Sequence, residues 1–215
     1  MPSKNTVKEF DVDQMWHVYN RGVEKRMIFM DDLDYRVLLS YLKIALGPEI
    51  PKETVNLDLA QVFNLRRAHL HSEVELVAYC LMPNHFHLLL YQYSPDGISK
   101  LMRSISTGYV MYFNKRYKRE GRLFQGTYKA SHISSDQYWL HASRYIHLNP
   151  LDAKEDYKIY PYSSYKYFAG KQRPKWLHPE WITKSFIGTE EYKTFVADYQ
   201  SYKYELDSLK KQLAA

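Results

Sequence analysis

The stretch Ala78-Tyr-Cys-Leu-Met-Pro-Asn-His-Phe-His-Leu-Leu-Leu90 decides the fold. The apolar run over 74–82 has strand character, a Pro-Asn pair typical of a tight turn follows, and 86–92 predicts a second buried strand. Because side chains alternate along a strand, His85 and His87 are expected on one face. Two imidazoles on one face of a rigid strand can hold a metal ion, although a His-x-His pair without further context is most often two partly buried, hydrogen-bonded histidines.

Outward from this hairpin, apolar periodicity predicts the remaining elements. They are a strand over 14–21, a helix from Asp31-Asp32 to Gly47-Pro48, a helix over 98–115, a strand over 123–133 and a helix over 136–148. This order predicts an α+β fold of the ferredoxin-like split βαβ type, an antiparallel sheet with helices on one face. We expect one domain over 1–150 and a C-terminal extension over 151–215, helical within 189–211; the segment 47–72 gives no clear pattern.

The composition describes a basic globular protein. Its 215 residues are 45% hydrophobic, enough for a substantial core, and carry a net charge of +6. A basic surface favours a polyanionic partner. The chain also holds 21 Tyr, 9 Phe and 4 Trp. Aromatic rings among Lys and Arg suit single-stranded nucleic acid, because unpaired bases stack on them. Most of these tyrosines are nevertheless expected in the core.

Cysteine usage and hydropathy indicate the compartment. The single cysteine, Cys80, cannot form an internal disulfide and is expected to be a small core residue. The first ten residues lack the apolar region of a signal peptide, and no segment approaches the roughly 20 apolar residues of a membrane span. We therefore expect a cytoplasmic protein, associated with the nucleoid when bound to DNA, and no membrane partner.

A second pair of polar residues completes the candidate chemistry. Tyr145 and Asn149 stand four residues apart and so share one helix face. If that face packs beside the histidine strand, the amide oxygen of Asn149 joins His85 and His87 in a mixed ligand set that suits Mg²⁺ or Mn²⁺ holding a phosphate. Tyr145 would then be a nucleophile, its phenol having a pKa of about 10. Spacing alone favours structural roles for both residues, a packing tyrosine and a helix C-cap before proline, because i, i+4 pairs are common.

Several segments carry a resemblance to a known family. They are Leu81-Met-Pro-Asn-His-Phe-His-Leu-Leu-Leu90, Gly121-Arg-Leu-Phe-Gln-Gly-Thr-Tyr-Lys129 and Arg144-Tyr-Ile-His-Leu-Asn-Pro150, joined by Tyr19-Asn-Arg-Gly22 and Pro161-Tyr-Ser-Ser-Tyr165. In this order they resemble the single-tyrosine HUH transposases (IS200-like transposases), and most of all the REP-associated tyrosine transposase branch. The likeness runs from about residue 12 to residue 170.

The resemblance implies a metal-dependent endonuclease and strand transferase for single-stranded DNA. Carried over by position, His85 and His87 are metal ligands, Asn149 is the third ligand, and Tyr145 is the nucleophile that forms a 5′-phosphotyrosine and leaves a free 3′-OH. The substrate is expected to be single-stranded DNA with a hairpin of the REP type, and the protein to act as a monomer or homodimer. Two alternatives stay open: a domesticated hairpin-binding protein without catalysis, and a metal phosphodiesterase that uses water.

Further residues are weaker candidates. A second His-x-His pair, His69 and His71, could join the first pair in a zinc site, but a solvated loop is the preferred interpretation, since closed four-ligand sites are more often rich in cysteine. His141, one turn before Tyr145, and His17, in the first strand, are retained as site candidates. Residues expected to contact DNA phosphates are Arg21, Lys115, Arg116, Lys118, Arg119 and Arg122.

Overall fold

The computed structural model describes residues 10–48 and 69–199, which fold around one four-stranded antiparallel sheet. Its strands lie in the order β2-β3-β1-β4. They are β1 (Gln14–Arg21), β2 (Val74–Met82), β3 (His85–Gln92) and β4 (Lys129–Ile133). Helices separate β1 from β2 and β3 from β4, so this is the predicted ferredoxin-like α+β arrangement.

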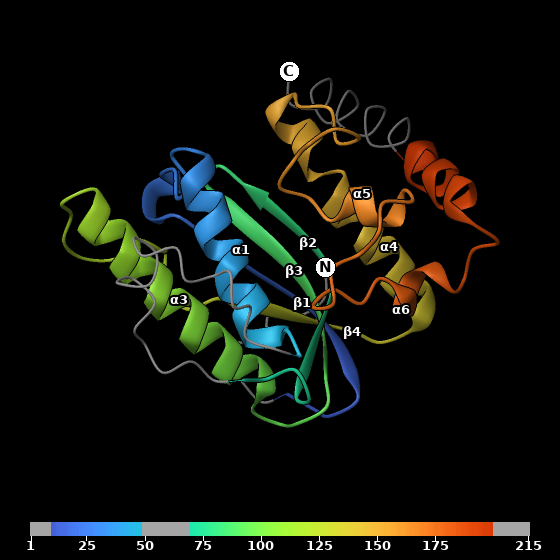
Figure 1. Cartoon of the computed structure of the whole chain (residues 1–215), viewed down its shortest axis with the longest axis horizontal. Helices are drawn as coiled ribbons and strands as arrows, with labels where there is room; N and C mark the ends of the chain where they lie inside the picture. The colour runs from blue at the N-terminus through green and yellow to red at the C-terminus, as the bar shows by residue number, and fades with distance from the viewer. Residues whose placement is uncertain (1–9, 49–68, 200–215) are drawn as a thin grey trace, which may run out of the picture.

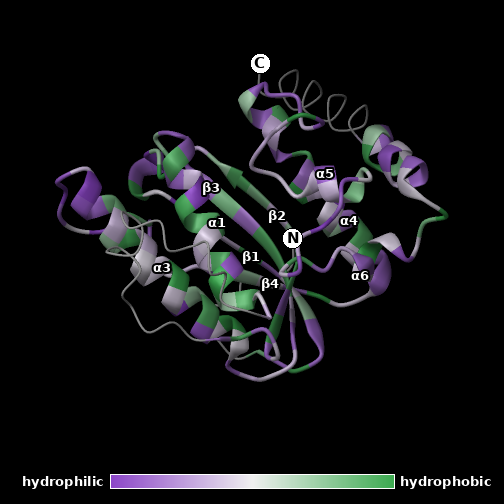
Figure 2. Cartoon of the chain, in the orientation of Figure 1, coloured by the Kyte–Doolittle hydropathy of each residue, from purple (hydrophilic) through white to green (hydrophobic). Residues whose placement is uncertain are grey.

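The two crossover helices cover one face of the sheet. These helices, α1 (Asp32–Leu46) and α3 (Gly97–Arg116), lie side by side on it (Figure 1). Gly108 permits this close approach, because a Cβ there would lie 2.5 Å from the ring of Tyr41 on α1. Phe86, Leu88 and Leu90 of β3 point into the resulting core. Apolar residues therefore fill the layer between sheet and helices, which Figure 2 shows in green.

The opposite face carries the later elements. Helix α4 (Asp136–His147) packs on β2, β3 and β4, and a 3₁₀ turn (Asn149–Ala153) follows it. The short helices α5 (Tyr165–Phe168) and α6 (Glu180–Thr183) lie on the same side (Figure 1). A second apolar cluster fills this layer, with Leu89 from β3 and Ile146 from α4 among its members. The histidine strand therefore lies between the crossover helices on one side and α4 on the other.

The chain after residue 150 runs along the outer edge of β2. Backbone hydrogen bonds join Leu81 N to Tyr162 O (3.0 Å), Ser164 N to Tyr79 O (2.9 Å) and His178 N to Leu76 O (2.8 Å). Backbone groups of an edge strand are thus satisfied by the C-terminal segment. Residues 189–199 are helical, and the rest of the helix predicted to reach 211 lies outside the described residues.

The strand predicted over 123–133 is wrong in its first half, since β4 begins at Lys129. Only an isolated bridge, between Gly22 and Phe124, precedes it. The side-chain amide of Asn20 donates to the carbonyl of Gly126 (3.1 Å), so a side chain takes the place of a ladder hydrogen bond. Residues 123–128 form a loop that is tied to the end of β1 by the backbone hydrogen bonds Gln125 N to Arg21 O and Val23 N to Leu123 O (2.9 Å each), without continuing the strand. In the described part of the chain, no helix is long and apolar enough to cross a membrane.

Candidate active site

Strand pairing gathers the predicted site residues on the face that α4 covers. β1 and β3 are neighbours, with Tyr19 opposite His87 and Arg21 opposite His85. Side-chain alternation puts His17 on this face as well. Tyr145 lies on α4, and its ring packs edge-on against two histidine rings. The ring centroids are 5.8 Å apart for His17 and 5.6 Å apart for His87. The fold thus assembles the tyrosine and the histidine pair at one place.

His87 is held by a histidine of the neighbouring strand. Its Nδ1 lies 2.8 Å from Nε2 of His17, and the rings stack with centroids 5.0 Å apart. Burial lowers the pKa of His17 to about 4, so this ring is neutral at pH 7 and can accept a hydrogen bond. We assign the shared proton to His87 Nδ1, which places a lone pair on His87 Nε2. A ring oriented in this way through its second nitrogen is typical of a metal-ligating histidine.

His85 is oriented by the turn residue before it. Nδ1 of His85 lies 2.7 Å from Oδ1 of Asn84, whose Nδ2 donates to the carbonyl of Lys25 (3.3 Å). That second bond fixes which end of the Asn84 amide faces the ring, so Nδ1 of His85 is the donor. Burial lowers the pKa of His85, which favours the neutral ring with a lone pair on Nε2. Asn84 therefore selects the tautomer in which His85 can bind a cation.

The amide of Asn149 faces His85 with its oxygen. Its Nδ2 donates to the carbonyls of Tyr145 (2.9 Å) and Ile146 (3.4 Å), near the end of α4. This bonding leaves Oδ1 pointing at Nε2 of His85, 3.5 Å away. The side chain is only 2% exposed. The C-cap residue of α4 is Leu148, and the side chain of the next residue, Asn149, bonds the last carbonyls of the helix; these bonds set the orientation of the candidate ligand oxygen.

These bonds place two hydrogen-bond acceptors, Nε2 of His85 and Oδ1 of Asn149, face to face. A cation between them would relieve the mismatch, and the adjoining His87 would add a third donor atom. In residues 10–48 and 69–199 no three His, Cys, Asp or Glu side chains gather to hold a metal, so an amide oxygen is needed to complete the set. The donor set of two imidazoles and one amide oxygen fits a divalent cation with open positions.

Tyr145 stays accessible above this cluster. The residue is 43% exposed, although its phenol is partly enclosed. Burial raises the pKa of Tyr145, so the hydroxyl keeps its proton at neutral pH. A phenol in this position can reach a group bound at the histidines from the solvent side.

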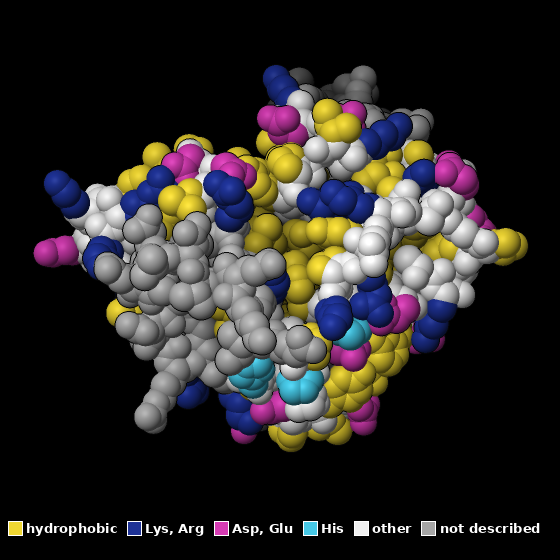
Figure 3. Space-filling model, in the orientation of Figure 1, with side chains coloured by type: hydrophobic (Ala, Val, Ile, Leu, Met, Phe, Trp, Pro, Cys, Tyr) yellow, Lys and Arg dark blue, Asp and Glu magenta, His cyan; other side chains and the backbone are white. Residues whose placement is uncertain are grey.

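The predicted basic residues fall into two groups. Arg116 forms ion pairs with Asp31 (2.5 Å) and Asp34 (2.6 Å), which give it a structural role. Arg119 donates to Asn114 (3.2 Å). The exposed cations are Arg21, Lys115, Lys118 and Arg122. The loop after α3 that carries several of them is hydrophilic (Figure 2), and on the face in Figure 3 basic and acidic side chains are interspersed.

The other histidines lie away from the cluster. His69 and His71 are exposed just before β2, whereas His85 pairs with the far end of that strand, so the second pair does not join the first. His141 is exposed, bonds Arg144 (2.6 Å) and packs against the ring of Phe195 on the helical segment 189–199.

The sequence did not identify two residues of the site, Tyr19 and Asn84. Tyr19 stacks against His17 (centroids 5.1 Å apart) and His87 (5.8 Å). Tyr19 stands two residues after His17, and side chains at this spacing along a strand lie on one face. This spacing could have identified Tyr19 as a site residue. Asn84 was interpreted only as a turn residue, and nothing in the sequence pattern shows that its side chain turns back to His85.

Comparison with known proteins agrees with this architecture. Residues 50–149 match the family described as "Transposase IS200 like". A solved structure of a REP-associated tyrosine transposase bound to a REP hairpin has a TM-score of 0.52, is 15% identical, and the match covers 78% of this chain and 86% of that one. That likeness shows a shared fold.

A second solved structure, of a protein from Deinococcus radiodurans R1 proposed to be a transposase, has a TM-score of 0.36, is 16% identical, and the match covers 68% of this chain and 94% of that one. No curated protein matches the sequence. The family match spans β2, β3, α3, β4 and α4, so this part of the chain is similar to the IS200-like transposases.

Proposed function

We propose that this protein is a transposase that cleaves and rejoins single-stranded DNA with Tyr145 as the nucleophile, as in the REP-associated tyrosine branch. The observation that carries the proposal is the position of the phenol. It is held 5.6 Å, ring centroid to centroid, from His87, above a cluster whose acceptor atoms face one another. A purely structural role for Tyr145 would not explain why these polar groups are gathered next to its ring.

In the proposed step, Oη of Tyr145 attacks the scissile phosphorus. The Oη–P bond forms as the bond from phosphorus to the 3′ oxygen breaks. The phenolic proton leaves to solvent, and the departing oxygen takes one up to give a free 3′-OH. The product is a 5′-phosphotyrosine, which keeps the energy of the phosphodiester, so the 3′-OH of another end can reverse the step without an outside energy source.

His85, His87 and Asn149 would hold the divalent cation, Mg²⁺ or Mn²⁺. When bound, it supplies Lewis-acid polarisation of the phosphate. The protein's own contribution is positioning: Asn84 and His17 fix the two rings, and the hydrogen bonds to the end of α4 fix the amide. The side chain of Asn149 bonds the end of the helix that carries Tyr145. One turn of backbone therefore fixes the position of the proposed nucleophile relative to a proposed ligand.

The proposed substrate is single-stranded DNA that folds into a hairpin. The REP-associated transposase with this fold was solved bound to a REP hairpin, and we extend that class of partner to this chain. Exposed Arg21 lies next to the cluster, opposite His85 in the strand pairing. Lys115, Lys118, Arg119 and Arg122 would add phosphate contacts from the end of α3.

The test uses a hairpin from DNA flanking the gene, labelled at its 5′ or 3′ end. It is incubated with protein and Mg²⁺ or Mn²⁺, with EDTA as control, and resolved on denaturing gels. We expect a protein–DNA adduct that requires the metal. Tight binding without cleavage would instead favour a domesticated hairpin-binding protein, and cleavage without an adduct would favour a phosphodiesterase that uses water.

A further inference from the structure

The loop between α3 and β4 is surrounded by hollows that the catalytic site does not use. One hollow of about 470 Å³ lies between the end of β1 and residues 125–129. Tyr19, Arg21 and Lys129 are among its lining residues. Tyr19 also stacks on His87, so this hollow opens directly beside the candidate active site. Its volume is within the roughly 300–1,000 Å³ of small-ligand sites, which suits one nucleotide at a time.

Two further hollows continue around the same loop. One, of about 370 Å³, shares Asn20, Gly126 and Thr127 with the first and reaches Arg103 on α3. The other, of about 570 Å³, shares Gly126 and Thr127 and reaches Arg122. The shared lining residues make the hollows adjacent, so together they form a path from the active site over the sheet edge to α3. We call this path the loop groove.

The charge along the loop groove has one sign. Its charged lining residues are Arg21, Lys129, Arg103 and Arg122, all of them exposed, and no Asp or Glu is among the described residues that line the three hollows. This contrasts with the hollow beside the helical segment 189–199, where Glu190 lies among the lysines. A path with cations only is suited to a phosphate backbone.

Aromatic and amide side chains also line the loop groove; of its aromatic rings, that of Tyr19 is half-buried, whereas Phe124 and Tyr128 are buried. Tyr19, Phe124 and Tyr128 contribute to its lining, and Gln125, whose Oε1 accepts from Nε of Arg21, stands at its first hollow. A Cβ at Gly126 would meet nothing within 4 Å, so the backbone is open to a ligand there. Aromatic rings interleaved with cations are typical of sites for unpaired bases. A DNA duplex is too large to enter hollows of this size, since its major groove alone is about 12 Å wide.

We propose that the loop groove binds the unpaired nucleotides that flank the cleaved phosphodiester and leads that strand from the active site to α3. This inference rests on the proposed function, since it takes single-stranded DNA as the substrate. It assigns a role to Lys129 and Arg103, which charge patterning had not singled out. It also gives the segment 121–129 a function beyond connecting α3 to β4.

The experiment compares a blunt hairpin with hairpins that carry unpaired nucleotides on the 5′ or the 3′ side. Dissociation constants are measured by fluorescence anisotropy at several salt concentrations, with EDTA present to prevent cleavage. The variants are Lys129→Ala and Arg103→Ala, and Lys171→Ala removes an exposed cation outside the groove as control. The wild type should gain affinity from one of the extensions. Each groove variant should reduce that gain and lower the salt slope by about 0.7, and the control should do neither.

Photo-cross-linking gives a second readout that needs no variant. With 5-iodo-deoxyuridine in the extension, cross-linked peptides should contain residues 121–129 or Tyr19. The inference is overturned if neither extension adds affinity, if the groove variants weaken the blunt hairpin equally, or if cross-links fall only on other segments. A chain that binds no hairpin and forms no adduct would instead overturn the proposed function.

Discussion

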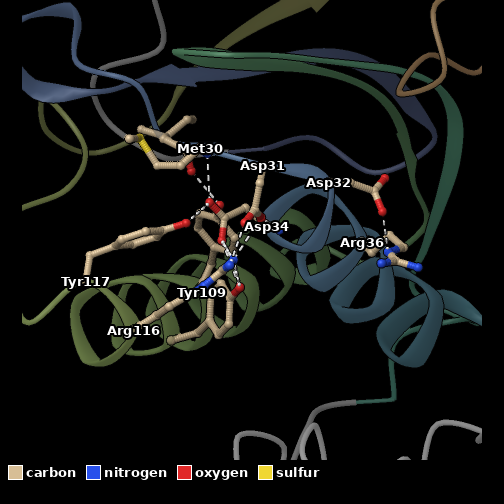
Figure 4. Close-up of polar contacts among 10 residues, drawn as sticks. Met30, Asp31, Asp32, Asp34, Arg36, Tyr109, Arg116 and Tyr117 are labelled. Carbon is tan, nitrogen blue, oxygen red and sulfur yellow. Dashed lines mark hydrogen bonds and ion pairs between the residues drawn. The ribbon is translucent and has the colours of Figure 1, made fainter.

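The sheet separates two polar clusters of opposite character. On the side of α1 and α3, the carboxylate of Asp34 is 0% exposed and accepts from Met30 N (2.7 Å), Tyr112 Oη (2.8 Å), Tyr117 Oη (2.9 Å) and Arg116 Nη1 (2.6 Å) (Figure 4). On the side of α4, Nε2 of His85 and Oδ1 of Asn149 lie 3.5 Å apart, and in the tautomer that we assign to His85 from its bond to Asn84 both are acceptors. The first cluster is satisfied by protein groups, and the second lacks a positive partner between its acceptors.

This difference separates stability from function. A buried carboxylate with four donors is complete. Removing it leaves two hydroxyls and a backbone N–H without their acceptor and takes from Arg116 one of its two carboxylate partners. Two acceptor atoms that face each other beside an exposed phenol do not stabilise the fold. Such an arrangement is expected where a ligand binds. Substitutions in the two clusters should therefore have separable effects.

The largest effect is expected from Tyr145→Phe. Loss of the nucleophile should reduce adduct formation by about 10⁴-fold or more, because removing a catalytic nucleophile commonly costs that much. The half-exposed ring keeps its contacts with His17 and His87, so the melting temperature and hairpin affinity should stay near wild type. Denaturing gels and calorimetry check this. An undiminished adduct in the variant would assign the nucleophile elsewhere.

Asp34→Ala tests the closed cluster. We expect a loss of about 2–4 kcal/mol in the free energy of unfolding, as in broken buried pairs, reduced because Arg116 is partly exposed. Urea denaturation measures the loss. A change below about 0.5 kcal/mol would show that the cluster does not stabilise the fold.

Asn84→Ala tests the orientation of His85. The ring loses the acceptor for its Nδ1 proton, and Mn²⁺ affinity should fall by about 10–100-fold, the range found for outer partners of metal ligands. Asn84→Asp keeps an acceptor oxygen at that position and should retain most of the affinity. Isothermal titration calorimetry compares the two variants. Equal losses in both would argue against an orienting role.

The smallest effect is expected from Arg36→Ala, which removes the exposed ion pair with Asp32 (2.8 Å) in Figure 4. The two side chains are 67% and 57% exposed, and such pairs along a helix contribute about 0.3–0.5 kcal/mol. Urea denaturation should barely distinguish this variant from wild type. If Arg36→Ala lowered the free energy of unfolding as much as Asp34→Ala does, the proposed difference in stabilisation between buried and exposed ion pairs would be wrong.

Local patterns predict most of the fold and part of the site. The strands over 14–21 and 74–82 and the helix from Asp32 follow from periodicity, because one-sided burial leaves a repeating pattern. The loop over 123–128 could not be predicted, since a side chain 106 positions from Gly126 replaces its ladder bond. The ion pairs of Arg116 could not be predicted for the same reason: a charge run does not show that its partner, Asp34, lies 82 positions away.

The site divides in the same way. Alternation along the strand indicated that His85 and His87 share a face. The helix face predicted for Tyr145 and Asn149 is wrong, because α4 ends at His147; Asn149 lies in the following 3₁₀ turn, and its side chain bonds the backbone carbonyl of Tyr145. The orientations of His85 and His87 depend on the hydrogen bonds that they donate to Asn84 and His17, which no spacing rule reveals.

The most direct measurement is a Mn²⁺ titration of metal-free protein, followed by electron paramagnetic resonance, for the wild type and His87→Ala. The face-to-face acceptors predict one ion bound per wild-type chain and a loss of that site in the variant, with the melting temperature of the metal-free chain little changed. Failure of the wild type to bind Mn²⁺, or equal binding by both proteins, would contradict the assignment of this cluster as a metal centre.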